Sequence, residues 1–185
     1  MSFRAAAPDA IYYRVEARNG EEFKVSRLAI QQSEVLHRLV EAMGYTLDDV
    51  EMKEAIPIEN IDAETLKLIF QWCEHHKGEP IPEYDLGFVP ENVVIPGFDA
   101  KLMDIDLEKV FNLMDAANYL GIKQLFAVSS TKANIMLQEE ERAPQEDAAQ
   151  EEAAQEDADA ENGEQRISVS AYLVDKFHRF LSFFQ

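Results

Sequence analysis

The residues best suited to chemistry stand together in one short stretch, Phe70 to Pro80, which reads FQWCEHHKGEP. It holds the chain's single cysteine, Cys73, followed by Glu74, His75 and His76. A thiolate beside imidazole groups could serve as a nucleophile or, with more ligands, bind a metal ion such as zinc. Either chemistry needs partner residues elsewhere in the chain.

Those partners are missing from the sequence. A structural zinc site takes four ligands, whereas the other two histidines, His37 and His178, are isolated and share no spacing with the stretch. A cysteine nucleophile needs a base and an orienting group, and no motif supplies them. The chain also has neither the G-x-G-x-x-G nor the G-x-x-x-x-G-K pattern of phosphate-binding loops. We therefore expect no catalytic residue, no metal ion and no cofactor, and an enzyme that uses Cys73 is the least favoured hypothesis.

A helix that positions the stretch gives it a structural interpretation. Asp62 can cap this helix, and Gly78 and Pro80 can end it. Cys73 then lies on the apolar side, while His75 to Lys77 stand in the last turn, where cationic side chains interact favourably with unpaired carbonyls. The apolar positions follow the i, i+3, i+4, i+7 spacing of a helix: Leu66, Ile69, Phe70 and Cys73.

The rest of the chain predicts a small sheet and further helices. Alternating side chains from Ile11 to Ala17, followed by Asn19-Gly20, are typical of a β-hairpin with a type I′ turn. Four prolines mark residues 79–97 as a long loop. The other elements are a strand at Ala55 to Ile58 and helices at Ser33 to Met43, Asp106 to Leu120 and Ile122 to Leu137.

The last quarter of the chain has a different composition. Residues 139–164 carry 12 acidic side chains against the single Arg142, which favours frayed helix or disorder and a solvated spacer, with binding of a basic partner as the alternative. The segment after it, ISVSAYLVDKFHRFLSFFQ, places large apolar side chains at three- and four-residue spacings. It predicts an amphipathic helix that must dock on its own domain, a second copy or a partner.

Charge and composition exclude several kinds of partner. A net charge of -19 over 185 residues disfavours binding to nucleic acid and to anionic membranes. No apolar run reaches the roughly 18 residues that a membrane span requires. One cysteine permits no internal disulfide, and the first residues lack the apolar core of a secretory signal. We expect a single main domain in a reducing intracellular compartment.

Two blocks of the sequence resemble the hallmark blocks of the Skp adaptor family, the small subunits of Skp-cullin-F-box (SCF) ubiquitin ligases. They are AIPIENIDAETLKLIFQWCEHHK, Ala55 to Lys77, and FDAKLMDIDLEKVFNLMDAANYLGIKQL, Phe98 to Leu125. The resemblance implies an α/β fold of the BTB/POZ type, a small three-stranded sheet flanked by helices. It also implies an adaptor without chemistry of its own, which bridges a cullin to F-box proteins in ubiquitin-dependent protein degradation, in the cytoplasm and nucleus.

The resemblance also implies which residues meet each partner. Asn118 and Tyr119, in the AANYL motif, match positions that face the cullin; plain solvent exposure is their alternative. Val110 and Met114 match positions that face the F-box protein and fit an ordinary core equally well. The full set predicted to face the F-box protein or another partner is Val110, Met114, Phe126 and Met136, with Phe177, Phe180 and Phe184 from the terminal helix.

The chain departs from this family at three places. Phe98 stands where the family usually has Trp, and residues 129–132 are more polar than expected. After Leu137 the acidic tract and the terminal helix replace the two helices with which the family clasps the F-box. The predicted domains are therefore residues 1–137 of BTB/POZ type, an acidic linker at 138–166 and an amphipathic helix at 167–185. The alternative function is a self-associating scaffolding protein, a homodimer.

Overall fold

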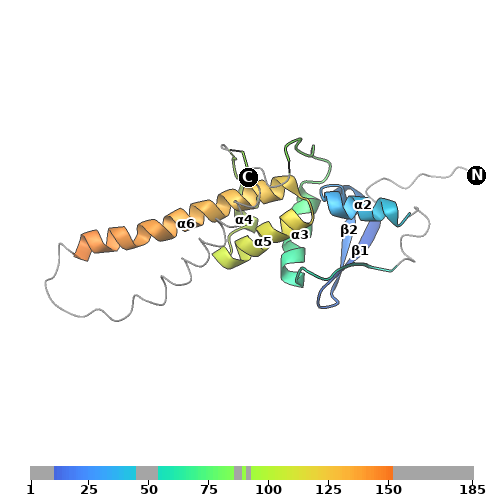
Figure 1. Cartoon of the computed structure of the whole chain (residues 1–185), viewed down its shortest axis with the longest axis horizontal. Helices are drawn as coiled ribbons and strands as arrows, with labels where there is room; N and C mark the ends of the chain where they lie inside the picture. The colour runs from blue at the N-terminus through green and yellow to red at the C-terminus, as the bar shows by residue number, and fades with distance from the viewer. Residues whose placement is uncertain (1–10, 45–53, 86–88, 91–92, 152–185) are drawn as a thin grey trace, which may run out of the picture.

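The structure of the chain is a computed structural model that describes residues 11–44, 54–85, 89–90 and 93–151 (Figure 1). Within the last helix, side chains are described as far as Glu140 and at Arg142. The predicted terminal helix at 167–185, with Phe177, Phe180 and Phe184, lies outside the described residues.

Three strands form one mixed sheet. β1 (Tyr12–Ala17) pairs antiparallel with β2 (Glu22–Ser26) and parallel with β3 (Ile56–Ile58), so the strand order is β2-β1-β3. The predicted hairpin and third strand are thus confirmed.

The turn of the hairpin differs from the predicted two-residue type I′ turn. Ala17 and Glu21 are the last pair, because the Ala17 amide donates to the Glu21 carbonyl at 2.9 Å. The Gly20 amide donates to the Ala17 carbonyl at 2.9 Å, and Gly20 has φ +83°. A three-residue loop that ends in a left-handed glycine is a common alternative hairpin connection, and it places the same two strands in register.

Four helix starts are fixed by side-chain caps. A side-chain oxygen at the N-cap of α1, α2, α3 and α5 accepts a hydrogen bond from the amide three residues later, which satisfies one of the free amides of the first turn. The described helices are α1 (Arg27–Ile30), α2 (Glu34–Ala42), α3 (Ala63–His75), α4 (Gly97–Leu102), α5 (Leu107–Tyr119) and α6 (Lys123–Glu151).

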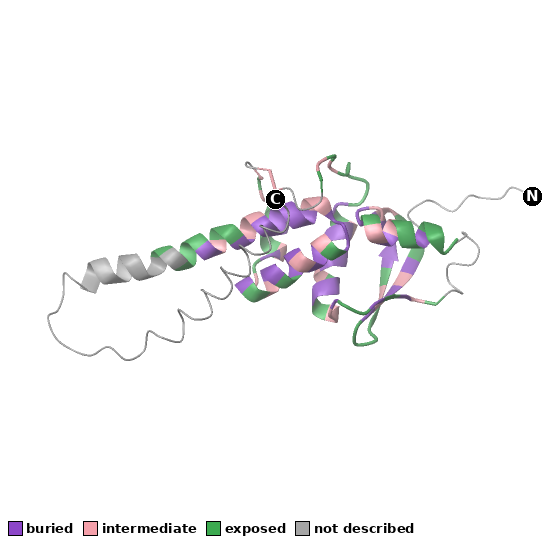
Figure 2. Cartoon of the chain, viewed as in Figure 1, coloured by how far each residue is buried: buried purple, intermediate pink, exposed green. Residues whose placement is uncertain are grey.

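The core lies between the sheet and the inward faces of α3, α5 and the first half of α6 (Figure 2). Burial of large apolar side chains of this kind is the main favourable term in folding. Among the described helices, none combines the length and the apolarity needed to cross a membrane. The largest fully buried side chains include Trp72, Phe111, Phe126, Ile30, Leu36 and Ile56.

Two helices differ from the sequence prediction. α4 begins inside the predicted loop, directly after Pro96. α6 does not end at Leu137 but continues as one helix to Glu151, so it includes half of the predicted acidic linker. In Figure 1 this second half projects past the rest of the domain, away from α5. Ala, Glu and Gln have high helix propensity, which accounts for the continuation.

Candidate functional site

Cys73 is part of the core and is not a reactive thiol. Its side chain is buried, and burial, reinforced by the neighbouring charge of Glu74, raises its pKa far above the ordinary value. The Glu74 carboxylate accepts hydrogen bonds from the Ser26 amide at 2.6 Å and the Ser26 hydroxyl at 2.9 Å. The two residues therefore have structural roles, with Glu74 tying α3 to the end of β2.

His76 has a different place from the one predicted. It stands at the C-cap of α3, but its imidazole contacts two carboxylates instead of the last carbonyls: it is buried, with Nδ1 2.8 Å from Glu79 Oε2 and Nε2 2.9 Å from Asp99 Oδ1. Burial lowers the pKa of His76, but the hydrogen bonds to the two carboxylates outweigh it, so the pKa is raised. Gln32 Nε2 donates to the carbonyls of His76 and Glu79 at 2.9 and 3.0 Å.

Ring contacts complete this group, which we call the His76 cluster: Gln32, Trp72, His76, Glu79 and Asp99. The indole of Trp72 stacks on the imidazole of His76 with ring centroids 4.2 Å apart. The cluster fastens α4 and the start of the loop after α3 to the end of α3. Nowhere in the described parts of the chain do three His, Cys, Asp or Glu side chains form a group that could hold a metal ion.

The end of α5 forms a corner with exposed side chains at Asn60 and Tyr119 and a buried backbone turn behind them. We call it the α5 corner: Asn60, Asn118, Tyr119, Leu120 and Gly121. The Tyr119 side chain is 49% exposed, and its hydroxyl oxygen accepts a hydrogen bond from Asn60 Nδ2 at 3.3 Å. Asn118 is half-buried, and its Oδ1 has no hydrogen-bond partner among the described residues. The corner thus presents the polar aromatic side chain of Tyr119 to a partner, whereas the Asn118 Oδ1 atom is itself buried.

The backbone of the α5 corner is held firmly by the start of α2. The Leu120 carbonyl accepts from the Ser33 hydroxyl at 2.6 Å and from the Val35 amide at 3.3 Å. Gly121 has φ +68°, and its carbonyl accepts from the Glu34 amide at 3.5 Å. Carbonyls that have no partner within α5 therefore accept hydrogen bonds from amides that have no partner within α2. These bonds fix the orientation of the corner.

Three of the four described residues predicted to face an F-box protein are in the chain's own core. Val110 and Phe126 are 0% exposed and Met114 is 1% exposed. The assignment of these three to a partner surface is corrected, because a side chain packed inside its own domain offers no surface to a second chain. Met136 is half-buried, and the adjacent Ile135 is 39% exposed, so the partner-accessible part of α6 lies near its middle.

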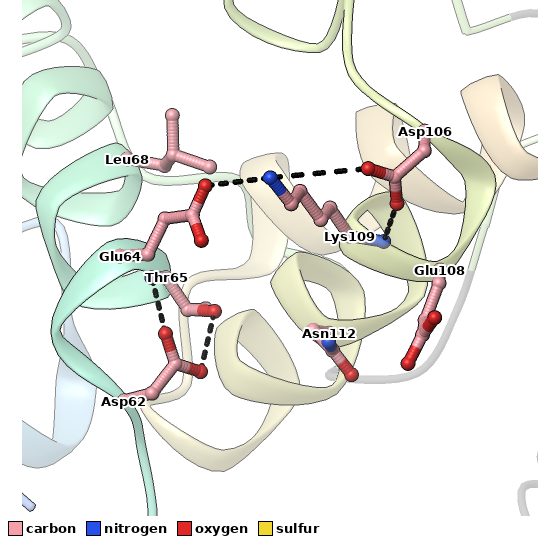
Figure 3. Close-up of a pocket in the computed structure, with 8 residues that line it drawn as sticks. All are labelled: Asp62, Glu64, Thr65, Leu68, Asp106, Glu108, Lys109 and Asn112. Atoms are coloured by element: carbon pink, nitrogen blue, oxygen red, sulfur yellow. Dashed lines mark hydrogen bonds and ion pairs between the residues drawn. The ribbon is translucent and has the colours of Figure 1, made fainter.

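A pocket of about 300 Å³ opens between the first turns of α3 and α5 (Figure 3). Lys109 Nζ lies 2.7 Å from Glu64 Oε1 and 3.9 Å from Asp106 Oδ2, and the hydrogen bond to Glu64 raises the pKa of Lys109. On the opposite wall, Asp62 accepts from the amide and hydroxyl of Thr65 at 2.9 and 2.8 Å. Lys109 of α5 is thus paired with Glu64 of α3, and Asp62 with Thr65, so the pocket lies at the contact between the two helices.

Comparison with known proteins identifies the family. Residues 15–78 match the Skp1 family, tetramerisation domain. The E3 ubiquitin ligase complex SCF subunit sconC of Arthroderma otae is 34% identical over 121 residues, which are 64% of this chain and 70% of that protein. This chain belongs to the Skp1 family. The Skp1-related protein of Caenorhabditis elegans is 31% identical over 125 residues, 66% of this chain and 71% of that protein.

The matched range of this Skp1-family chain runs from within β1 to just after the end of α3. It therefore includes the whole sheet except the first residues of β1, and the predicted BTB/POZ-like fold is confirmed. Phe98 stacks on His75 with ring centroids 3.6 Å apart and planes 9° apart. This stacking is an aromatic contact between α4 and the end of α3.

Sequence reasoning missed the His76 cluster. Asp99 lies 23 positions after His76, and no periodic pattern links two such positions. The one available signal was composition: a carboxylate between Phe98 and Ala100, three residues after Pro96. That signal is too weak to indicate burial.

Proposed function

We propose that this chain is a non-catalytic adaptor of an SCF-type E3 ubiquitin ligase. In this role it binds a cullin at the α5 corner and an F-box protein along α6, and so brings a substrate receptor to the ligase in ubiquitin-dependent protein degradation. Its proposed place of action is the cytoplasm and nucleus.

The observation that carries the proposal is the similarity to proteins named as SCF subunits. The sconC subunit of Aspergillus oryzae, like that of Arthroderma otae, is named an E3 ubiquitin ligase complex SCF subunit, and it is 33% identical over 120 residues, 71% of its length. Similarity at this level over most of a relative's length supports the same kind of role. The buried Cys73 thiol adds support, because it removes the one candidate nucleophile that the sequence offered.

The α5 corner has the properties of a binding surface. Tyrosine is enriched at protein interfaces because its ring supplies a large apolar area and its hydroxyl a hydrogen bond. Tyr119 is exposed by half and is held by Asn60, while the backbone behind it is fixed by α2. A side chain positioned in advance loses less entropy on binding.

Copurification with a matched pair of variants tests the proposal. Tyr119→Lys should abolish recovery of the cullin and leave recovery of F-box proteins unchanged, because the change is confined to the α5 corner. Asn112→Lys, at an exposed position of the same helix, is the control and should recover both partners. Recovery of neither partner by the unaltered chain would refute the adaptor role.

A second candidate function is self-association, which the name of the matched family, a tetramerisation domain, favours. The exposed face of α2 carries two large apolar side chains, Leu39 at 37% and Met43 at 43% exposure. Light scattering of the chain alone tests this candidate. A mass that stays at one chain at all concentrations would exclude it, and a dimer lost in Leu39→Asp would support it.

A further inference from the structure

Midway along α6, apolar side chains lie exposed where the helix leaves the core. Leu137 is the last core residue of α6, while Ile135 is 39% exposed and Met136 half-buried. The corner at residues 120–122 makes α5 and α6 an antiparallel pair, so the start of α5 lies beside the middle of α6 (Figure 1). We call Ile135 and Met136 the exit surface.

We propose that residues 167–185 of the same chain dock on the exit surface as an amphipathic helix. This segment carries an apolar stripe at helical spacing, and exposure of such a stripe to water is unfavourable. The stripe consists of Val169, Tyr172, Leu173, Phe177, Phe180 and Phe184.

The lengths of the intervening pieces permit this return. From Ile135 to the end of α6 at Glu151 is 16 residues, or about 24 Å at a rise of about 1.5 Å per residue. A helix over residues 167–185 would be about 28 Å long, close to the distance back along α6. The 15 residues between, 152–166, can extend to about 50 Å and average about 21 Å end to end if they behave as a flexible chain. The segment therefore reaches the exit surface without strain.

Charge favours this segment over an outside partner. The chain carries -19 overall, whereas residues 167–185 hold Lys176 and Arg179 against one acidic residue, Asp175. Exposed Glu139 and Glu140 lie one turn beyond the exit surface on α6. A weakly basic helix that runs antiparallel to α6 brings its cations toward these carboxylates. A linker of this length also gives a local concentration in the millimolar range, which a second copy cannot match.

Hydrogen-exchange mass spectrometry on the full chain tests the docking directly. The unaltered chain should show slowed exchange in residues 169–184, independent of protein concentration. Ile135→Asp on the exit surface and Phe180→Asp on the stripe should each abolish that protection. Matched controls are Asn134→Asp, at an exposed position next to Ile135, and Ser182→Asp, on the opposite side of the stripe; both should keep it.

Three results would overturn the docking. One is unprotected amides in residues 169–184 of the unaltered chain. Another is equal protection in Ile135→Asp and Asn134→Asp. The third is protection that appears only at high concentration, which would mean that a second copy supplies the segment. All four variants lie at exposed positions or beyond the described domain, so their circular dichroism should match that of the unaltered chain.

A consequence for partner binding rests on the proposed function. An F-box protein that uses α6 near Met136 must displace the segment, so deletion of residues 167–185 should tighten its binding. Unchanged or weaker F-box affinity after the deletion would contradict this competition. The hydrogen-exchange experiment needs no partner, so it tests the docking independently of the adaptor role.

Discussion

At the scale of single residues, His76 shows how burial changes the role of an ionisable group. The imidazole lies between a fully buried carboxylate, Asp99, and a half-exposed one, Glu79, with His75 beside it. One oxygen of Asp99, Oδ2, has no partner among the described residues, so the hydrogen bond from His76 is important to its burial. The cluster thus stabilises the α3–α4 contact through charge.

Removal of His76 should reduce stability in a pH-dependent way. Because the hydrogen bonds to Glu79 and Asp99 raise the pKa of His76 above its ordinary value in the folded chain, its contribution is fully present below about pH 6.5 and is lost as the pH rises through the folded pKa. His76→Gln should therefore lower the free energy of unfolding by about 1–3 kcal/mol at low pH, with a smaller loss at high pH. Urea unfolding of the unaltered chain and of His76→Gln at several pH values measures this difference in the free energy of unfolding.

The exposed histidine His37 supplies the control for that series. Its exposed imidazole lies 3.5 Å from the exposed carboxylate of Glu41, so His37→Gln should leave the stability nearly unchanged. A stability difference between the unaltered chain and His76→Gln that is constant with pH would show that His76 is not charged in the folded state.

A second prediction at the residue scale concerns Gly121. Its φ of +68° suits glycine, and a Cβ there would stand 3.1 Å from the Cβ of Glu34. Gly121→Ala should therefore cost about 1–2 kcal/mol of stability. Gly97→Ala, where φ is not positive and nothing lies within 4 Å, should be neutral or stabilising. Equal thermal midpoints for the two variants would disprove the role of the α5 corner backbone.

At the scale of elements, α6 is one helix with an unfavourable residue inside it. Pro144 lies within the span Lys123–Glu151 and has no amide to donate, which costs about 3 kcal/mol in a helix interior. Pro144→Ala should increase the helical signal in circular dichroism and slow amide exchange after residue 143. Ala149→Ser, a mild change in the same tract, is the control. An unchanged signal in Pro144→Ala would indicate that the tract beyond Pro144 is not helical in solution.

The elements show where sequence reasoning succeeds and where it stops. Caps and periodicity are local, so Ser33, Asp62 and Asp106 marked three helix starts correctly. Burial depends on how helices face one another, which periodicity alone does not determine. Val110 and Met114 lie on an apolar stripe that fits a core or a partner surface equally well. The packing of α5 against its neighbours buries both side chains in the core.

At the scale of the whole molecule, the chain is a compact domain with a rigid corner at one place and a projecting helix at another (Figure 1). The α5 corner lies at the end of α5 that joins α6, and the exit surface lies beside the start of α5, so the 13-residue length of α5 separates them. That is about 20 Å along the helix axis. Under the proposed function, a cullin at the α5 corner and an F-box protein near Met136 would therefore contact different side chains.

Reconstitution of a three-part complex tests the central claim most directly. The chain is mixed with a purified cullin and a purified F-box protein. The complexes are separated by size-exclusion chromatography, and the molar mass of each is measured by light scattering. The account predicts one complex that contains all three proteins, and with Tyr119→Lys a complex of the chain and the F-box protein alone. A chain that binds each partner only in the absence of the other would contradict the claim that it connects them.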